Sequence, residues 1–282
     1  MADGLRKLYP GGKAKAFNIT YDDGVTQDVR FVALLNRFKL KGTFNLNSQL
    51  AREGFVWTHK NGMLVKRLPL DKALINYRGH EIGSHTLTHP SLNDLPDAEI
   101  KRQMRSDKAD LEATFGVEVK GFAVPFDHYD ETCERIAKQS GFEYARISEF
   151  SLSYKPCTEY FRWKTGVYHI MPELVSFVDG FFETDEELAV CQIVGHSYDL
   201  DALHMWDVME DICRRVSRAD DVWSCTNLEL VRYLKAMEQA EITDTAVINH
   251  SETDLWFLVD GKTVKLAPGE TIIVFVLVIV LS

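Results

Sequence analysis

The sequence predicts an α/β fold, a (β/α) barrel of about seven strands with a small C-terminal β appendage. Two observations predict the barrel. Strand-like and helix-like segments alternate from residue 16 to residue 240, which indicates a parallel sheet with helical crossovers. About seven such units fill this length, and closure is more economical for them than an open sheet. A third observation predicts the appendage, because the pattern changes near residue 242. We therefore expect a barrel over residues 1–242 and an appendage over residues 243–282.

Short apolar runs that end in turn residues predict the strands of the barrel. The first run ends directly before the acidic turn Asp22-Asp23-Gly24, and the run before Gly195-His196 is apolar except for Gln192. The predicted strands cover residues 16–21, 43–46, 81–83, 121–124, 144–147, 188–194 and 221–224.

Apolar residues at three- and four-residue spacing predict the helices between these strands. The clearest helix covers residues 93–115, where Ile100, Met104 and Leu111 share one face. Pro96 lies near its start and Gly116 follows its end, as is typical of helix termini. The other predicted helices cover residues 28–40, 131–139, 205–216 and 228–240.

The appendage is predicted from a hairpin signal. Residues 255–259 and 262–266 flank Asp260-Gly261, a pair that tolerates the positive φ angles of a type I′ turn. Residues 272–281 are all apolar, too few to span a membrane, which takes about 20. Their β-branched content predicts a strand buried on both faces, and an artefactual C-terminus is the rival interpretation. The first twelve residues contain no apolar segment typical of a secretory signal.

Charge and cysteine usage exclude several classes of protein. The net charge is −10 and no basic stripe is present, so the sequence does not predict a nucleic-acid partner. No membrane partner is expected either. The five cysteines are scattered and form no Cys-x-x-Cys pair, which argues against a zinc ribbon and favours free thiols in the cytoplasm. Nothing in the sequence indicates the oligomeric state.

Four polar motifs follow predicted strands at their C-terminal ends, where barrel active sites are built. They are Asp22-Asp23-Gly24, His85 with His89, Pro125-Phe126-Asp127, and Gly195-His196. Three of these motifs alone also have an ordinary structural interpretation: an acidic turn for Asp22-Asp23-Gly24, a polar loop for His85 and His89, and a hydrogen-bonded histidine at the end of a strand for His196.

The first two motifs together predict a metal site. Asp22 and Asp23 are adjacent carboxylates that repel each other unless a cation lies between them. His85 and His89 are four residues apart, a spacing that places two imidazoles on one face of a helical turn. One carboxylate with two imidazoles is a common three-ligand set that leaves a position open for water.

The remaining groups supply proton transfer. The spare carboxylate, Asp22 or Asp23, can take a proton from water whose pKa the metal lowers to about 7. Hydrolysis then needs an acid for the leaving group, and His196 fits by residue type and by its place after a strand.

Taken in order, the motifs resemble the polysaccharide deacetylase family, the NodB-homology carbohydrate esterases. Five stretches carry the resemblance, and TNLE at 226–229 also fits one branch of the family. The stretches are NITYDDG at 18–24, GTFN at 42–45, HEIGSHTLTHP at 80–90, FAVPF at 122–126 and VGHSY at 194–198.

The resemblance implies a distorted (β/α) barrel and a metal-dependent amide hydrolase, an enzyme of carbohydrate metabolism acting on non-peptide C–N bonds. It also implies the site residues. Asp22 would be the catalytic base and His196 the general acid, and the backbone amide near Phe126 would help to bind the oxyanion. The metal ligands would be Asp23, His85 and His89. Zinc is the first expectation, with nickel, cobalt, iron or manganese open.

The sequence departs from the family pattern at two places, one within the fourth stretch and one directly after it. Ala123 replaces an arginine that orients the base in many members, and Asp127 replaces a frequent glycine. Arg162 or Arg146 can be considered as the substitute arginine.

The Asp-Trp motif that tunes the acid in the family has no direct match. Trp163 is the candidate for the aromatic group, and Asp199 or Asp201 for the carboxylate.

The expected function is removal of an acyl group, N-acetyl first, from an amino sugar or oligosaccharide. Two alternatives stay open: cleavage of a different small amide on the same scaffold, and a non-catalytic carbohydrate-binding relative. Trp256 and Phe257 in the appendage suggest either a carbohydrate surface or, as we expect, packing against the barrel.

Overall fold

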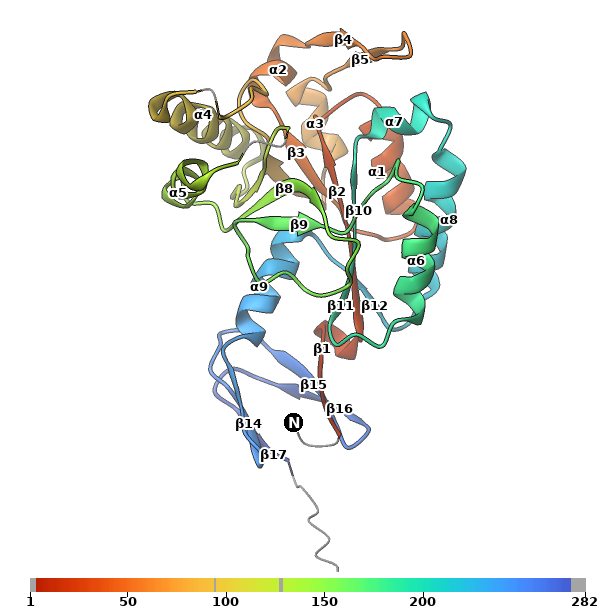
Figure 1. The fold of residues 1–282 in the computed structure, drawn as a ribbon, viewed down its shortest axis with the longest axis vertical. Coiled ribbons are helices and arrows are strands. Elements are labelled where there is room, and N and C mark those ends of the chain that lie inside the picture. Colours follow the sequence, from red (N-terminus) through yellow and green to blue (C-terminus); the bar gives the residue numbers. More distant parts are fainter. Residues whose placement is uncertain (1–3, 94, 127–128, 275–282) are drawn as a thin grey trace, which may run out of the picture.

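The computed structural model describes residues 4–93, 95–126 and 129–274. Its centre is one parallel sheet in which β10, β11, β2, β3, β6, β7, β8 and β9 are neighbours in that order. β12 also pairs with the first half of β2 (Figure 1). The strands are β2 (Lys15–Asp22), β3 (Thr43–Leu46), β6 (Glu81–Ser84), β7 (Gly121–Ala123), β8 (Tyr144–Phe150), β9 (Trp163–Thr165), β10 (Val167–Tyr168), β11 (Ala189–Gly195) and β12 (Val222–Ser224).

The sheet closes because β9 and β10 are separated by Gly166 alone. A side chain at this position would meet the carbonyl oxygen of Gln192 at 2.5 Å, so only glycine lets the two short strands run on beside β11. Counted as one kinked strand, β9 and β10 complete a ring of seven strand positions. The predicted barrel of about seven strands is confirmed.

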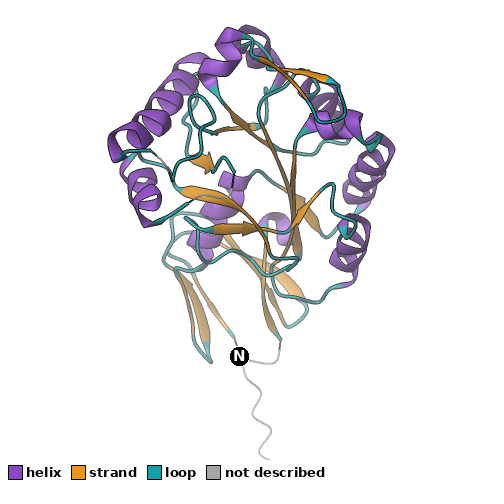
Figure 2. Ribbon diagram, turned by 45° about the horizontal axis from the view of Figure 1, so that its top comes forward, coloured by secondary structure: helices purple, strands orange, loops and turns teal. Residues whose placement is uncertain are grey.

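Helices surround this sheet on its outer side (Figure 2). The five helices predicted from apolar spacing are present, with ends that differ by a few residues; α4 begins at Asp97 because Pro96 takes the N-cap position. The helices are α1 (Asp28–Arg37), α2 (Ser48–Glu53), α3 (Leu70–Asn76), α4 (Asp97–Phe115), α5 (Glu131–Gln139), α6 (Leu174–Glu183), α7 (Ser197–Ala202), α8 (Trp206–Arg218) and α9 (Asn227–Met237).

Besides α7, two stretches contain elements that apolar patterning did not predict. Residues 47–80 hold α2, α3 and a hairpin of β4 (Val56–Thr58) and β5 (Leu64–Lys66). Residues 148–188 hold β9, β10 and α6. Both stretches border the site described below, so the elements that the sequence did not predict bear on function.

Strand β2 shows how the wall of the barrel positions the site. Phe17, Ile19 and Tyr21 belong to the hydrophobic core that also contains residues of the surrounding helices. Because side chains alternate along a strand, the polar residues between them face the opposite way. Two of these, Thr20 and Asp22, hydrogen-bond to Asn45 of the neighbouring strand. The sequence of β2 therefore directs Asp22 into the barrel at its C-terminal end.

The appendage consists of two small antiparallel sheets below the barrel (Figure 1). The predicted hairpin is confirmed, with Asp260 and Gly261 both at positive φ. The N-terminal strand β1 joins it by pairing with β15, which the sequence did not indicate. The strands are β1 (Leu5–Leu8), β13 (Ala240–Ile242), β14 (Ala246–Asn249), β15 (Leu255–Val259), β16 (Lys262–Leu266) and β17 (Thr271–Ile273).

The apolar C-terminal run behaves differently from its prediction. Thr271–Ile273 form β17, which pairs with β14 only, and Ile273 is 58% exposed. The expectation of a strand buried on both faces is therefore wrong for this part, because β17 lies at the edge of its sheet. Val274, the next residue of the run, is buried, and residues 275–281 lie outside the described residues.

Among the described residues, no helix combines the length and the apolar character that a membrane span requires. Phe257 is fully buried in a cluster that includes Tyr233 of α9, and the backbone N–H of Trp256 donates to the Tyr233 hydroxyl at 3.2 Å. These contacts are the packing against the barrel domain that we expected for the hairpin aromatics.

Candidate metal centre and active site

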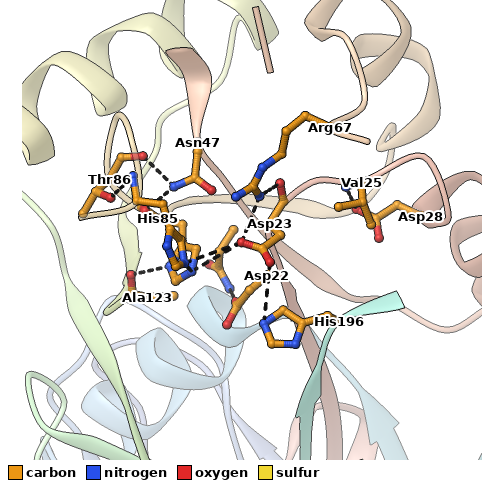
Figure 3. A network of polar contacts seen from close by, with 12 residues as sticks. Asp22, Asp23, Val25, Asp28, Asn47, Arg67, His85, Thr86, Ala123 and His196 are labelled. Carbon is orange, nitrogen blue, oxygen red and sulfur yellow. Dashed lines mark hydrogen bonds and ion pairs between the residues drawn. The ribbon is translucent and has the colours of Figure 1, made fainter. Parts of the chain in front are cut away.

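The polar motifs meet in one pocket at the C-terminal ends of the barrel strands (Figure 3). Its volume is about 350 Å³. Carboxylates and imidazoles form its floor, and apolar side chains form most of its walls. The residues that line it are Asp22, Asp23, His85, His89, Val124, Phe126, Arg146, Ser148, Phe150, Tyr168, Val194, His196 and Tyr198.

Asp22 is buried and is held at both carboxylate oxygens. Asn45 Nδ2 donates to Oδ1 at 2.8 Å, and Arg146 Nη2 donates to Oδ2. Burial alone would raise the pKa of Asp22, but Arg146, His85 and His196 outweigh it and hold the pKa below its usual value. Asp22 is therefore an ionised carboxylate of fixed orientation, as a base must be.

Arg146 reaches Asp22 from the strand next to the expected one. Ala123 on β7 pairs in register with Arg146 on β8, so the arginine is displaced by one strand and not lost. Arg162, the other candidate, is bonded to Glu134 at 2.8 Å and does not contact the base. Asp127, the second departure, lies outside the described residues.

Asp23 leaves the strand in a conformation that is unusual for a residue with a side chain, with φ at +83°. Such backbone strain persists only where surrounding contacts enforce it. Here the buried Arg67 donates from Nη1 to the Asp23 carbonyl oxygen and lies 2.8 Å from Oδ1. Burial acts to raise the pKa of Asp23, but Arg67 and the three nearby imidazoles lower it well below its usual value.

His85 and His89 come from a loop and not from the helical turn that their spacing suggested. Thr86 and His89 both have positive φ, and Asn47 Nδ2 donates to the carbonyl oxygens of His85 and Thr86. The loop nevertheless brings the two Nε2 atoms to 3.1 Å from each other. The turn was predicted wrongly, because four-residue spacing cannot distinguish a helix from a bent loop.

The imidazoles have the protonation that metal ligation requires. His85 Nδ1 donates to the carbonyl oxygen of Ala123 at 2.8 Å, which leaves the Nε2 lone pair free. Burial lowers the pKa of His85 to about 4 and also lowers the pKa of His89. Both rings are therefore neutral near pH 7.

These groups fit a divalent cation. One ligand atom from each of Asp23, His85 and His89 lies within 4.8 Å of the others. Asp23 Oδ1 is 3.6 Å from His89 Nε2 and 4.0 Å from His85 Nε2. Ligands at about 2.1 Å from one tetrahedral ion lie about 3.4 Å apart, close to these values. Asp23 Oδ1 is also buried without a well-formed hydrogen bond, as expected of an atom kept for a metal.

His196 follows β11 on the opposite side of Asp23. Its Nε2 is 3.8 Å from Asp23 Oδ2, and its Nδ1 is 3.3 Å from Asp199 Oδ2. The hydroxyl of Tyr168 lies 2.8 Å from both Asp199 Oδ2 and His196 Nδ1. Burial would lower the pKa of His196, but the carboxylates, Asp199 first, outweigh it and raise the pKa. A histidine that holds its proton in this way is suited to act as an acid.

The structure separates the candidates for the groups that tune the acid. Asp199 contacts His196, whereas Asp201 accepts a hydrogen bond from Trp206 Nε1 at 2.7 Å. Trp163 packs edge-on against Tyr144, in the hydrophobic cluster that also contains Phe257 and Tyr233. Tyr198 supplies the aromatic group, because its ring stacks on His196 at 4.9 Å with an interplanar angle of 18°.

Phe126 lies at the mouth of the pocket with a positive φ of 58° and a side chain that is 54% exposed. Its ring meets that of His89 edge-on at 4.7 Å, and Ser148 Oγ donates to its carbonyl oxygen. Across the pocket, the exposed Phe150 stacks on Tyr168. The entrance is therefore aromatic.

Sequence reasoning missed Arg67 and Tyr168. Arg67 follows β5 in a segment with no helical or alternating pattern, so nothing in the sequence linked it to Asp23, 44 positions away. Tyr168 belongs to a strand of two residues. The one available signal was that a charged or polar residue beside buried apolar ones needs a partner.

Residues 10–145 match the family model described as polysaccharide deacetylase. A chitin deacetylase from Colletotrichum lindemuthianum is 29% identical over 121 residues, which cover 41% of this chain and 44% of the relative. The chain spans less than half of the length of the curated relatives it matches, with 39% to 44% of each covered.

Solved structures share the fold at low sequence identity. A proposed polysaccharide deacetylase from Mycobacterium smegmatis has a TM-score of 0.60 at 14% identity, covering 85% of this chain and 96% of that one. A mutant with restored activity of BA3943, a CE4 family pseudoenzyme from Bacillus anthracis, has a TM-score of 0.52 at 18% identity, covering 80% and 70%. At these identities the likeness shows the fold alone.

Proposed function

Because this chain belongs to the polysaccharide deacetylase family, we propose that it is a metal-dependent hydrolase of non-peptide C–N bonds. It removes an acyl group, N-acetyl first, from an amino sugar or oligosaccharide. One observation carries the proposal: a three-ligand cluster, a fixed carboxylate and a histidine whose pKa is raised by nearby carboxylates face the same pocket.

Asp23, His85 and His89 would hold the cation, for which zinc is the first choice because two imidazoles and one carboxylate suit it. When bound, the cation supplies Lewis acidity at the acyl oxygen and lowers the pKa of water.

Asp22 takes the proton from the attacking water. Asn45 and Arg146 occupy one position on each of its oxygens, and an ionised carboxylate has further lone pairs to receive a proton. Arg146 keeps Asp22 ionised and fixes its orientation, so the base needs no rearrangement before reaction.

His196 gives its proton to the departing nitrogen from Nε2, the atom that faces the pocket. Asp199 and Tyr168 bind the opposite ring nitrogen and fix the ring. The backbone amide of Phe126 is the proposed donor to the oxyanion, since fixed donors aimed at developing charge contribute strongly to catalysis.

The pocket suits an uncharged acylated sugar. Arg146 is the one arginine among the lining residues and is already engaged by Asp22, and no lysine lines the pocket, so no free arginine or lysine is left there for an anionic substrate. The apolar walls at Val124, Val194 and Phe150 can contact a methyl group and a sugar ring. A cytoplasmic location is part of the proposal, supported by five cysteines that are all free thiols.

The test is release of acetate from N-acetylated chitooligosaccharides by zinc-loaded and chelator-treated protein. We expect release by the loaded protein only, and an Asp22→Asn variant that binds the cation but loses about 10²- to 10⁴-fold in kcat. Asp244→Asn, an exposed aspartate of the appendage, is the matched control.

Two other outcomes distinguish the alternatives. Release from small amides but not from sugars would replace the substrate class and keep the mechanism. Binding of sugars without release, with every cation tried, would establish a non-catalytic relative and overturn the proposal.

A further inference from the structure

Arg67 is a buried cation bound to a proposed metal ligand, and the hydrolytic mechanism gives it no role. Its side chain is 4% exposed, and that of Asp23 is 7% exposed. Arg67 Nη1 contacts both the carbonyl oxygen and the Oδ1 atom of Asp23 (Figure 3). Oδ1 is the oxygen that faces the two imidazoles, so Arg67 and a cation share one atom.

The backbone around Arg67 is joined to the loop that carries Asp23. Thr26 N donates to Lys66 O at 2.9 Å, and Leu68 N donates to Gly24 O at 2.8 Å. Val25 and Arg67 form a bridge between these two bonds. The end of the β4–β5 hairpin is thus fixed to the three residues that follow Asp23.

The same hairpin reaches the acid on the other side of the pocket. The Arg67 guanidinium lies 4.9 Å from the ring centre of Trp57, within the range of a cation–π contact. Trp57 packs edge-on against Tyr198 at 5.6 Å, and Tyr198 stacks on His196. A continuous line of contacts therefore runs from Asp23 through the hairpin to His196.

We propose that Arg67 is a positioning residue that holds Asp23 in its ligating orientation, so that the β4–β5 hairpin sets the affinity of the site for a divalent cation. The inference rests on the proposed metal-dependent function. Asp23 has a strained positive φ, and the bond from Arg67 to its carbonyl oxygen enforces that conformation. Without Arg67 the loop relaxes and the third ligand leaves the position facing His85 and His89.

An opposing effect makes the inference testable. The guanidinium is positive and lies next to the atom that binds the cation, so charge repulsion alone would weaken binding. If repulsion dominated, removal of Arg67 would tighten binding. We expect positioning to dominate, because the guanidinium makes two contacts to Asp23 and residues that orient metal ligands typically contribute 10- to 100-fold in affinity.

The experiment measures zinc affinity by competition with a chromophoric chelator and needs no substrate. Arg67→Met is expected to weaken zinc binding about 10- to 100-fold. Arg67→Lys keeps the charge but loses the planar fork, so it should recover only part of the affinity. Trp57→Leu should cause a smaller loss in the same direction. Lys66→Met removes a charge from the adjacent exposed residue and should leave zinc affinity unchanged.

Hydrogen exchange of residues 54–67 checks the structural basis. Zinc should slow exchange of these amides in the wild-type protein and have no such effect in Arg67→Met. If Arg67→Met does not fold, Trp57→Leu carries the same comparison.

The results separate this inference from the proposed function. Wild-type protein that binds zinc, with Arg67→Met or Trp57→Leu binding it equally or more tightly, overturns the role of Arg67 and leaves the hydrolase proposal standing. Wild-type protein that binds no divalent cation overturns both.

Discussion

Arg146 and Ala123 occupy paired positions on neighbouring strands, and the arginine side chain crosses to the carboxylate of Asp22. In register, the Cα atoms of such a pair are about 5 Å apart, a distance that the long arginine side chain readily spans. The loss of an arginine from β7 and its presence on β8 therefore leave the base with the same kind of partner.

We expect Arg146→Met to lower kcat about 100-fold with little change in KM, because Asp22 loses the group that orients and ionises it. Arg162→Met, which removes a surface ion pair with Glu134, is the matched control. Adding Ala123→Arg to an Arg146→Ala variant should restore part of the activity. Equal kcat values for Arg146→Met and Arg162→Met would contradict the assignment.

Asp199→Asn should move the alkaline limit of activity to lower pH. Asp199 is the first of the groups that raise the pKa of His196, so its neutralisation lowers that pKa. An acid must be protonated to act, so activity is then lost at a lower pH as the pH rises. The measurement is kcat against pH. Asp201→Asn on the same helix, which contacts Trp206 instead, should leave the limit in place.

Zinc should stabilise the folded protein through its three ligands. At a zinc concentration about 100 times Kd, the free energy of unfolding should rise by about 2.7 kcal/mol. His85→Asn removes one ligand and should abolish most of this gain. His204→Asn is the control, because His204 is exposed and has a positive φ that asparagine tolerates. Equal stabilisation of the His85→Asn variant would refute the ligand set.

The titration of Asp107 should lower the free energy of unfolding as the pH rises. Its carboxylate is buried, accepting from Ser84 Oγ at 2.6 Å and Ser48 N at 2.7 Å, and burial raises its pKa to about 7. The folded state therefore keeps the proton above the pH at which the unfolded chain releases it. This contribution is complete below about pH 4 and lost by about pH 7, a change on the order of 4 kcal/mol.

The Asp107→Asn variant isolates that contribution. Asparagine can accept from Ser48 and donate to Ser84, so its stability relative to wild type should increase between pH 4 and pH 7. Urea unfolding at a series of pH values measures the difference, with Asp244→Asn as the control. A constant difference across this range would show that Asp107 is ionised in the folded protein.

The sequence was most informative about the elements that carry regular patterns. Helices with an apolar face and strands that end in turn residues were predicted to within a few residues, and the barrel followed from their order. Short elements such as β10 and the β4–β5 hairpin were missed, because two or three residues carry no period that can be recognised. The helical turn at His85 and His89 was wrong for a related reason, since positive φ at Thr86 and His89 leaves no trace in residue spacing.

By itself, the sequence determined which chemical groups end the barrel strands: Asp22 and Asp23, the two loop histidines, and His196. Only the tertiary structure decided their partners. Arg146 meets Asp22 across 124 positions of chain, and Arg67 meets Asp23 across 44. Strand register and barrel closure bring these side chains together, and both depend on contacts between segments far apart in the chain. A local pattern contains the identity of a reactive group but not the buried charge that will hold it.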